Sequence, residues 1–397
     1  MQMKFVSLSV TGEDIDEILR DISKAVLDRL GEHADFALVF PSSHFASRAE
    51  DLVSNLKSAI GARVMLGCTG EGVIGPAHEI EDQPAVAVVA ALLPGVDVMP
   101  FDIPKAALIN VALNPPLLRK HYAPPVDTRF LVMLADPFSA PMDGVLNAFN
   151  QEYENVPIIG GMASGARQPG ETVLMVNDRV IREGLVGVSF VGPIQADIIV
   201  SQGCRPVGPV FEVTESKNNV IDSLGGESPL LRIQSMLDEM DDEDRDLLRN
   251  GLFIGRAIDS GKESLGRGDF LIRGVLGVDS RTGAIAVSDV IDAGERVQFH
   301  LRDADTARED LEMMLSPHAL FGEPSGAFLF SCNGRGTRLY EEPDGDINAI
   351  RGFFSGLDLA GFFCAGEIGP IGGKNFLHGH TASLALIRPA APDPRPR

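Results

Sequence analysis

The densest group of reactive side chains lies in segment 361–381, with the sequence GFFCAGEIGPIGGKNFLHGHT. It combines closely spaced glycines with a thiol, a carboxyl group and two imidazoles. Glycines at this density let the backbone approach a ligand closely and supply positive φ angles. We therefore expect the segment to form one wall of a small-molecule site, with Cys364, Gly366 and Glu367 among its contacts.

A second segment repeats part of this pattern, because Cys68-Thr-Gly-Glu71 has the same Cys-x-Gly-Glu order as Cys364-Ala-Gly-Glu367. Backbone N–H groups of such loops can bind a carboxylate or phosphate, and a glutamate can accept hydrogen bonds from an ammonium or hydroxyl group. Alternatively, the cysteines are small apolar fillers and the glutamates cap nearby backbone. On the binding interpretation, the predicted ligand contacts are Cys68, Thr69, Gly70 and Glu71, with Gly160 and Gly161 from a third glycine-rich loop.

The segment Ser331-Cys-Asn-Gly-Arg-Gly336 contains the most attractive anion-binding side chain, Arg335. A guanidinium can hold a carboxylate by two parallel hydrogen bonds, although a surface salt bridge would use the same residue type. We expect Ser331, Cys332, Asn333 and Arg335 to contact the ligand.

Two histidines, His378 and His380, flank Gly379 and would point to the same side of an extended strand. They could form half of a metal site or a general base, or they could be hydrogen-bonded packing residues. The sequence shows no clear further ligands, so we place both histidines in the ligand site and predict neither a metal nor a cofactor. The glycine-rich loops match no nucleotide-binding fingerprint.

The elements that position these loops occur three times, as strand, turn, helix, strand, glycine-rich loop and strand. The three copies span residues 36–93, 130–191 and 327–387. Each copy places its loop at the end of a buried strand. We therefore expect the loops to converge on one cavity, and the Cys-x-Gly-Glu pattern to occupy the same place in the first and third copies.

Two lobes with weak internal symmetry are expected, each of a mixed α/β (α+β) class in which helices flank buried sheets. The predicted divisions are residues 1–225, residues 226–388 and a disordered Pro-rich tail at 389–397. An acidic run at 238–246 is interpreted as a solvated helix end. Thr11 is expected to cap a helix over 13–30, and Thr306 to begin a capping-box helix that ends before Pro317.

Composition limits the partners. The chain has 397 residues and a formal net charge of −22, so nucleic acids and anionic membrane surfaces are not expected as partners. Four widely spaced cysteines give no disulfide or zinc pattern. The N-terminal residues resemble a first strand more than a signal peptide, and no apolar run is long enough to span a membrane. The expected location is cytoplasmic.

Three stretches together resemble FIST domains. Leu329–Gly336, Gly361–Pro370 and Asn375–Ala382 are similar to the C-terminal half of that family, while Gly67–Gly72 and Pro157–Gly161 are similar to its N-terminal half. The resemblance implies a sensory module that binds small ligands such as amino acids. Family members often attach this region to an F-box or to signalling output domains, and this sequence has room for neither. A separate signalling or protein-degradation partner is therefore expected.

The function favoured by the sequence is therefore a cytoplasmic, sensory small-ligand-binding protein. Its ligand would be amino-acid-like or another small anionic metabolite, bound by glycine-rich loops of both lobes. The alternative is a cofactor-independent enzyme of the racemase or epimerase type, in which Cys68 and Cys364, or Cys332, act as paired acid and base. The sequence favours binding over catalysis.

Overall fold

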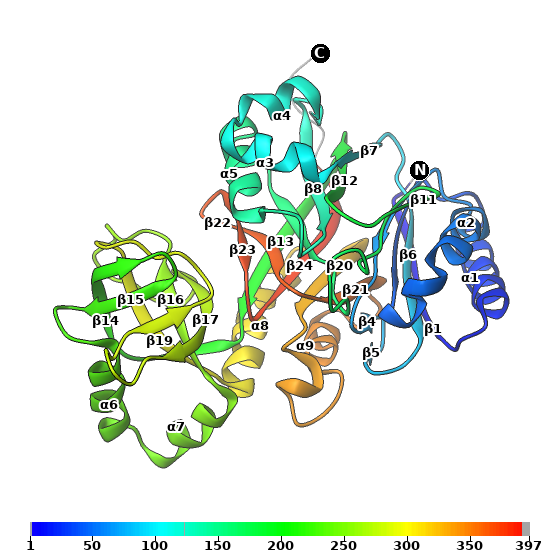
Figure 1. Ribbon diagram of the computed structural model, residues 1–397. Helices are drawn as coiled ribbons and strands as arrows, with labels where there is room; N and C mark the ends of the chain where they lie inside the picture. The colour runs from blue at the N-terminus through cyan, green and yellow to red at the C-terminus, as the bar shows by residue number, and fades with distance from the viewer. Residues whose placement is uncertain (1, 123, 391–397) are drawn as a thin grey trace. The chain divides into compact units, whose positions relative to one another are not determined.

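The computed structural model describes residues 2–122 and 124–390 (Figure 1). It has two compact units and a mixed α/β architecture, which confirms the predicted fold class. Of the described residues, the first unit comprises 2–122, 124–200, 311–377 and 381–390, and the second comprises 201–310 with 378–380. The predicted domain boundary at residue 225 stays a prediction. The two compact units are instead separated after residue 200 and after residue 310. Residues 391–397 of the predicted Pro-rich tail lie outside the described residues.

The first unit contains three six-stranded sheets, each built around one of the three repeats. The first repeat consists of β1 (Lys4–Thr11), α1 (Ile15–Leu30), β2 (Phe36–Pro41), the 3-10 turn η1 (Ser43–Arg48), α2 (Ala49–Ile60), β3 (Val64–Cys68), β4 (Val73–Ile74), β5 (Glu79–Ile80) and β6 (Ala85–Leu92). The second consists of β7 (Asp97–Ile103), α3 (Lys105–Leu113), α4 (Pro116–His121), β8 (Thr128–Ala135), α5 (Met142–Glu152), β9 (Ile158–Met162), β10 (Leu174–Val176), β11 (Arg179–Ile181) and β12 (Leu185–Val191).

The third repeat contains a long insertion. Its own elements are β13 (Ile194–Gln202), α8 (Ala304–Ala319), β20 (Gly326–Cys332), the 3-10 turn η3 (Gly336–Arg338), α9 (Gly345–Phe353), β21 (Leu359–Cys364), β22 (Glu367–Ile371), β23 (Lys374–His378) and β24 (Thr381–Pro389). The insertion follows β13, at the place where the other repeats continue directly into α1 or α3.

The three repeats exchange hairpins in a cycle. The strand orders are β1-β6-β2-β3-β10-β11, β7-β12-β8-β9-β22-β23 and β13-β24-β20-β21-β4-β5. The hairpin of the second repeat thus extends the sheet of the first, that of the third extends the second, and that of the first extends the third. Because each sheet is completed by a hairpin from another repeat, the three repeats depend on one another for their structure.

A glycine marks the same point in each parallel strand pair. The pairs are Val39 with Gly67, Met133 with Gly160, and Leu329 with Gly361. We call them the marker pairs, and their glycines the marker glycines. A Cβ atom on any of these glycines would lie within 2.0 Å of the facing carbonyl oxygen, so no larger residue fits there without backbone movement.

This register corrects one expectation. Cys68 comes one residue after its marker glycine, Gly67, whereas Cys364 comes three residues after Gly361. The structural counterpart of Cys68 is therefore Phe362, and that of Cys364 is Gly70. The two Cys-x-Gly-Glu patterns do not occupy the same place in their repeats.

Hydrogen bonds between the loops that follow β3, β9 and β21 form a closed ring. Ser164 N donates to Thr69 O at 3.2 Å, and Ala365 N donates to Met162 O at 3.0 Å. The third link joins the first and third repeats directly, because Phe363 N donates to Gly72 O at 3.0 Å. The Ser164 side chain adds to the ring, since its hydroxyl accepts from Glu71 N at 2.7 Å and donates to Phe363 O. The loops therefore converge primarily on one another.

The helices follow their apolar periodicity, with small corrections at their ends. Asp14, not Thr11, caps α1 by accepting from the N–H groups of Asp16 and Glu17, and Gly31 ends the helix with a φ of 79°. Asp303 accepts from two N–H groups at the start of α8, so Thr306 is not its cap. Pro317 lies inside α8 and does not terminate it.

The central core of the first unit joins all three sheets and is rich in phenylalanine. Phe40 stacks on Phe362 with ring centroids 4.9 Å apart, and Phe130 stacks on Phe190 at 4.4 Å. Burial of these rings, supported by favourable ring pairing, holds the repeats together.

The second unit is a closed barrel with strand order β14-β15-β18-β17-β16-β19. Its strands are β14 (Cys204–Lys217), β15 (Val220–Leu224), β16 (Leu252–Ala257), β17 (Phe270–Val278), β18 (Ile285–Val287) and β19 (Arg296–Arg302). The acidic run belongs to α6 (Pro229–Glu239) and α7 (Asp242–Leu247), whose acidic side chains are mainly exposed.

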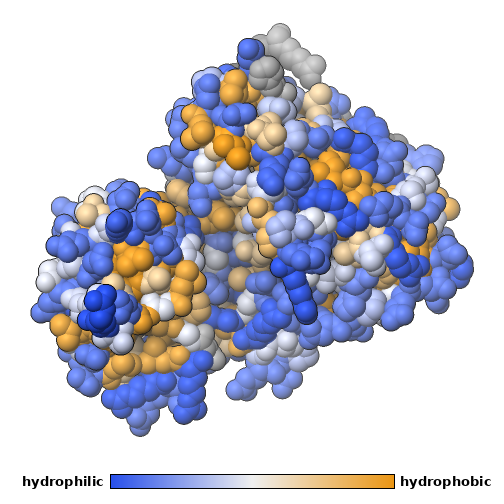
Figure 2. Space-filling view, viewed as in Figure 1, coloured by the Kyte–Doolittle hydropathy of each residue, from blue (hydrophilic) through white to orange (hydrophobic). Residues whose placement is uncertain are grey.

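The surface is mainly hydrophilic on the viewed face, and apolar residues form separate patches (Figure 2). Among the described residues, no helix is both long and apolar enough to cross a membrane.

Candidate functional site

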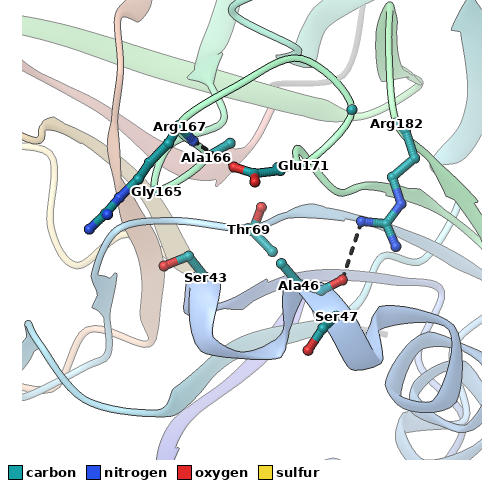
Figure 3. Close-up of a pocket in the computed structure, with 10 residues that line it drawn as sticks. Ser43, Ala46, Ser47, Thr69, Gly165, Ala166, Arg167, Glu171 and Arg182 are labelled. Carbon is teal, nitrogen blue, oxygen red and sulfur yellow. Dashed lines mark hydrogen bonds between the residues drawn. The ribbon is translucent and has the colours of Figure 1, made fainter.

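One cavity of the first unit is a pocket of about 450 Å³ between elements of the first and second repeats (Figure 3). We call it the open pocket. It is lined by Ser43, Ala46, Ser47, Thr69, Gly165, Ala166, Arg167, Gly170, Glu171 and Arg182. The volume lies within the range of small-ligand sites.

The floor of the open pocket is fixed by the ends of two parallel strands. Ser43 begins the turn η1 after β2, and its N–H donates to Gly70 O at 2.8 Å. Thr69 follows β3, its N–H donates to Val173 O at 2.9 Å, and its side chain is buried. Backbone pairing therefore fixes the main chain of both residues in the pocket lining, and Val173 N also donates to Thr69 Oγ1 at 3.4 Å.

The opposite wall comes from the second repeat and carries both signs of charge. Arg182 donates to Ala46 O at 3.2 Å and to Glu50 Oε1 at 2.8 Å. Glu171 accepts from the N–H of Arg167 and the side chain of Gln168, each at 2.9 Å. The hydrogen bond from the Arg167 backbone lowers the pKa of Glu171, so this carboxylate is ionised at neutral pH.

Glycine is required at the point where the two repeats meet. Gly165 has a φ of 81°, and a Cβ atom there would lie 2.5 Å from Cβ of Ser43. A larger residue would therefore be strained and would push into the rim of the open pocket.

A second cavity lies at the corresponding place between the third and first repeats, and we call it the closed cleft. It holds only about 10 Å³, room for about one water molecule. It is lined by Glu71, Gly72, Glu81, Asp82, Asn333, Arg338 and Phe363.

The strand registers align the lining residues of the two cavities. Counted from the marker pairs of each repeat, Asn333 corresponds to Ser43, Phe363 to Thr69, and Gly72 to Gly165. In the closed cleft, Arg338 forms an ion pair with Glu71, and Asn333 Nδ2 donates to the other oxygen of Glu71 at 3.2 Å. The ion pair and the larger side chains leave no room for a ligand.

Arg335, the predicted anion-binding residue, has a protein partner. Its Nε and Nη2 atoms lie 3.0 Å and 2.6 Å from the carboxylate oxygens of Asp346, and Nη2 also donates to Tyr340 Oη at 2.7 Å. Both Arg335 and Asp346 are buried, and Ser331 Oγ donates to Asp346 at 2.7 Å. Arg335 thus neutralises the buried carboxylate of Asp346, and the Ser331 hydroxyl helps to orient it.

Glu367 is also buried, where it accepts from Thr381 N at 3.2 Å and Thr381 Oγ1 at 2.9 Å. Burial is the main cause that raises its pKa to about 8. At neutral pH this side chain is mainly a neutral acid, so it is not a charged partner for an ammonium group.

The predicted thiols are buried. Cys68 and Cys364 are fully buried, and burial raises the pKa of both thiols well above the ordinary value. Neither of them lines the open pocket or the closed cleft.

The structure thus distributes the predicted site residues over several places. Thr69 lines the open pocket, while Glu71 and Asn333 line the closed cleft. Gly70 pairs with Ser42. The remaining residues of the first unit are buried strand or turn residues: Cys68, Gly160, Gly161, Ser331, Cys332, Arg335, Cys364, Gly366 and Glu367.

The two histidines group with the barrel unit. There the His380 ring lies 4.3 Å from the ring of Phe253, between centroids. Within residues 2–122 and 124–390, no three His, Cys, Asp or Glu side chains are arranged to hold a metal ion.

Sequence reasoning missed most of the open pocket, namely Ser43, Ser47, Arg167, Glu171 and Arg182. One signal was available: Arg167-Gln-Pro-Gly-Glu171 directly follows the glycine-rich loop of the middle repeat and carries two charges.

Family models match both parts of the chain: FIST N domain over residues 35–227 and FIST C domain over residues 230–370. Two uncharacterized proteins of Mycobacterium tuberculosis are similar to the chain: one is 37% identical over 88% of this chain and 90% of its own length, and the other 36% identical over 90% and 91%. An uncharacterized protein of Mycobacterium bovis is 36% identical over the same shares. A solved cyanuric acid hydrolase from A. caulinodans covers 98% of this chain and 100% of its own at 10% identity, but its TM-score of 0.31 supports no inference.

Proposed function

The chain belongs to the FIST family, and we propose that it senses a small polar ligand bound in the open pocket between its first and second repeats. FIST domains are sensory domains that bind small ligands in signal transduction. The proposal assigns that general role to one cavity of this chain and to one class of ligand.

The observation that carries the proposal is the open pocket itself, because it combines adequate volume with hydroxyl groups and both signs of charge. An amino-acid-like ligand suits this lining. Its carboxylate would face Arg182 or Arg167, and its ammonium would face Glu171. Thr69 and Ser43 supply hydroxyl groups from the first repeat, so a bound ligand would contact two repeats at once. Another small anionic metabolite would use the arginines without Glu171.

The glycine-rich loops contribute to this site in a different way from the one expected. Gly165 and Gly170 line the open pocket, and the loop after β3 contributes Thr69. The third repeat borders the closed cleft through Phe363, which lies in β21 itself. A separate signalling or protein-degradation partner and a cytoplasmic location stay predictions.

The alternative enzyme with paired thiols has less support. A thiol that exchanges protons with a substrate needs access to that substrate and a pKa near the working pH. Cys68 and Cys364 meet neither condition, since they are fully buried and their thiol pKa values are raised.

The test is a thermal-shift screen with amino acids and small carboxylic acids, followed by calorimetry on any compound that stabilises the protein. A ligand at 100 times its Kd should add about 2.7 kcal/mol to the free energy of unfolding. Arg182→Met should weaken binding. Arg338→Met is a matched control, because Arg338 is also a partly exposed arginine paired with a glutamate but lines the closed cleft.

Two outcomes would contradict the proposal. One is a screen in which none of these compounds raises the unfolding temperature. The other is a ligand whose affinity falls equally in Arg182→Met and Arg338→Met, since that would place the binding site outside the open pocket.

A further inference from the structure

Two cysteines face each other across neighbouring strands of the third repeat. Cys332 ends β20, Cys364 ends β21, and the two are direct partners in the parallel register of these strands. Neighbouring strands lie about 4.8 Å apart, which falls within the Cα–Cα range of about 4.4–6.8 Å found in disulfides. Both cysteines are buried, and neither is part of a disulfide in this structure.

The same place in the first repeat confirms that the two strand ends approach each other here. Ser42 corresponds to Cys332 and Gly70 to Cys364, and Ser42 and Gly70 form a parallel bridge. Only in the third repeat do both positions of this bridge carry sulfur.

The two thiols have different surroundings. The Cys332 sulfur accepts from Gly334 N at 3.4 Å, and its thiol donates to Asn333 Oδ1 at 3.9 Å and to the Glu367 carboxyl group. The Arg335 guanidinium also interacts with it electrostatically. Cys332 is 6% exposed and adjoins Asn333 in the lining of the closed cleft, whereas Cys364 is 0% exposed.

We propose that Cys332 and Cys364 form an oxidisable dithiol that reacts with small hydroperoxides to give a disulfide between β20 and β21. The Cys332 thiolate attacks one peroxide oxygen and becomes a sulfenic acid, and the other oxygen leaves as hydroxide, which becomes water on protonation. The Cys364 thiol then attacks the Cys332 sulfur, forms the S–S bond and releases a second water. Overall, two thiols are oxidised and one hydrogen peroxide is reduced to two waters.

The low exposure of the pair selects the oxidant by size. Because Cys332 is 6% exposed and Cys364 is 0% exposed, a molecule as small as hydrogen peroxide can reach the Cys332 sulfur more readily than an aromatic disulfide reagent. We therefore expect hydrogen peroxide to oxidise the native protein and bulky disulfides to leave the pair reduced. This reactivity does not depend on the open pocket, so it can be tested whether or not a ligand is found.

The test treats the full-length protein with hydrogen peroxide, blocks the remaining thiols under denaturing conditions and maps cysteine pairs by mass spectrometry. The thiol count should fall from four to two, with Cys332 joined to Cys364. Cys364→Ser should accumulate a sulfenic acid at Cys332 that a dione probe traps. Cys204→Ser should react like the unmodified sequence, because Cys204 lies in the barrel unit.

Three results would overturn the proposal: four remaining thiols, a disulfide that includes Cys68 or Cys204, or sulfinic acid at Cys332 while Cys364 stays a thiol. The map of the unmodified protein decides among these outcomes even if a serine variant does not fold.

Discussion

The open pocket and the closed cleft occupy the same place in different pairs of repeats, yet one has about 450 Å³ and the other about 10 Å³. Their backbones follow the same path: a strand end, a turn, a second strand end and a glycine five residues after the marker glycine. The difference lies in the side chains. A threonine in one is a phenylalanine in the other, a serine is an asparagine, and an arginine–glutamate pair fills the closed cleft.

The two cavities also differ in a buried residue close in sequence to their lining residues. Six residues after the marker position of the first parallel strand, the first repeat has the buried Phe45 and the third has the buried Arg335. An apolar ring therefore supports the open pocket, whereas a buried ion pair supports the closed cleft. A duplicated backbone can thus keep one ligand cavity and convert another into a structural interface.

The largest predicted effect concerns that buried ion pair. Arg335→Met should reduce the free energy of unfolding by about 3–5 kcal/mol, because Asp346 would stay buried without its charge partner. Urea unfolding measures the loss. The double variant Arg335→Met/Asp346→Leu should recover much of it, since it removes both charges. A loss below about 1 kcal/mol in the single variant would mean that Arg335 does not support the closed cleft.

The next effect concerns Ser164, whose hydroxyl links the loop after β3 to β21. Ser164→Ala should reduce the free energy of unfolding by about 1–3 kcal/mol, because it leaves Glu71 N and Phe363 O without their shared hydroxyl partner. Ser47→Ala is the control; Ser47 is an exposed residue of the open pocket, so its loss should change stability by less than about 0.5 kcal/mol. Equal effects in the two variants would show that the hydrogen-bond ring contributes little.

The third prediction compares a buried and an exposed carboxyl group. The pKa of Glu367 is raised from 4.5 to about 8 in the folded protein. Its stabilising contribution is therefore fully present below pH 4.5 and is lost as the pH rises to 8. The expected slope is about 1.4 kcal/mol per pH unit between these values. Unfolding in urea from pH 5 to 9 measures it.

Glu367→Gln should reduce the slope by about 1.4 kcal/mol per pH unit, because glutamine does not ionise. Glu79 should contribute a slope of its own, since burial raises its pKa to about 8 as well. Glu171→Gln should leave the slope unchanged, since the pKa of Glu171 is lowered and this group stays ionised throughout that range. A slope in Glu367→Gln equal to that of the unmodified protein would contradict the raised pKa of Glu367.

The smallest effect on stability is expected for Arg338→Met, because its ion pair with Glu71 is partly exposed and should contribute no more than about 1 kcal/mol. This variant nevertheless tests the comparison most directly. If the ion pair keeps the cleft closed, a crystal structure of the variant should show a larger cavity beside Phe363. An unchanged cavity would show that Phe363 and Asn333 are sufficient to close it.

The threefold repetition could be read from the sequence because it depends on local patterns. Apolar strands, helix periodicity and glycine-rich loops recur in the same order, and the family resemblance rested on short contiguous stretches such as Gly361–Pro370. The glycines of the parallel strand pairs could also be found locally, because Gly67 follows an apolar strand segment and Gly361 interrupts one.

The tertiary structure decided the register, the partners and the site. Cys68 and Cys364 looked equivalent by pattern, but strand pairing displaced them by two positions. Arg335 has the chemistry of an anion-binding residue, and only folding brought it to Asp346, eleven positions along the chain. The open pocket joins Thr69 to Arg182 because the hairpins are exchanged between repeats. Such long-range pairing depends on the packing of whole sheets, which no local segment encodes.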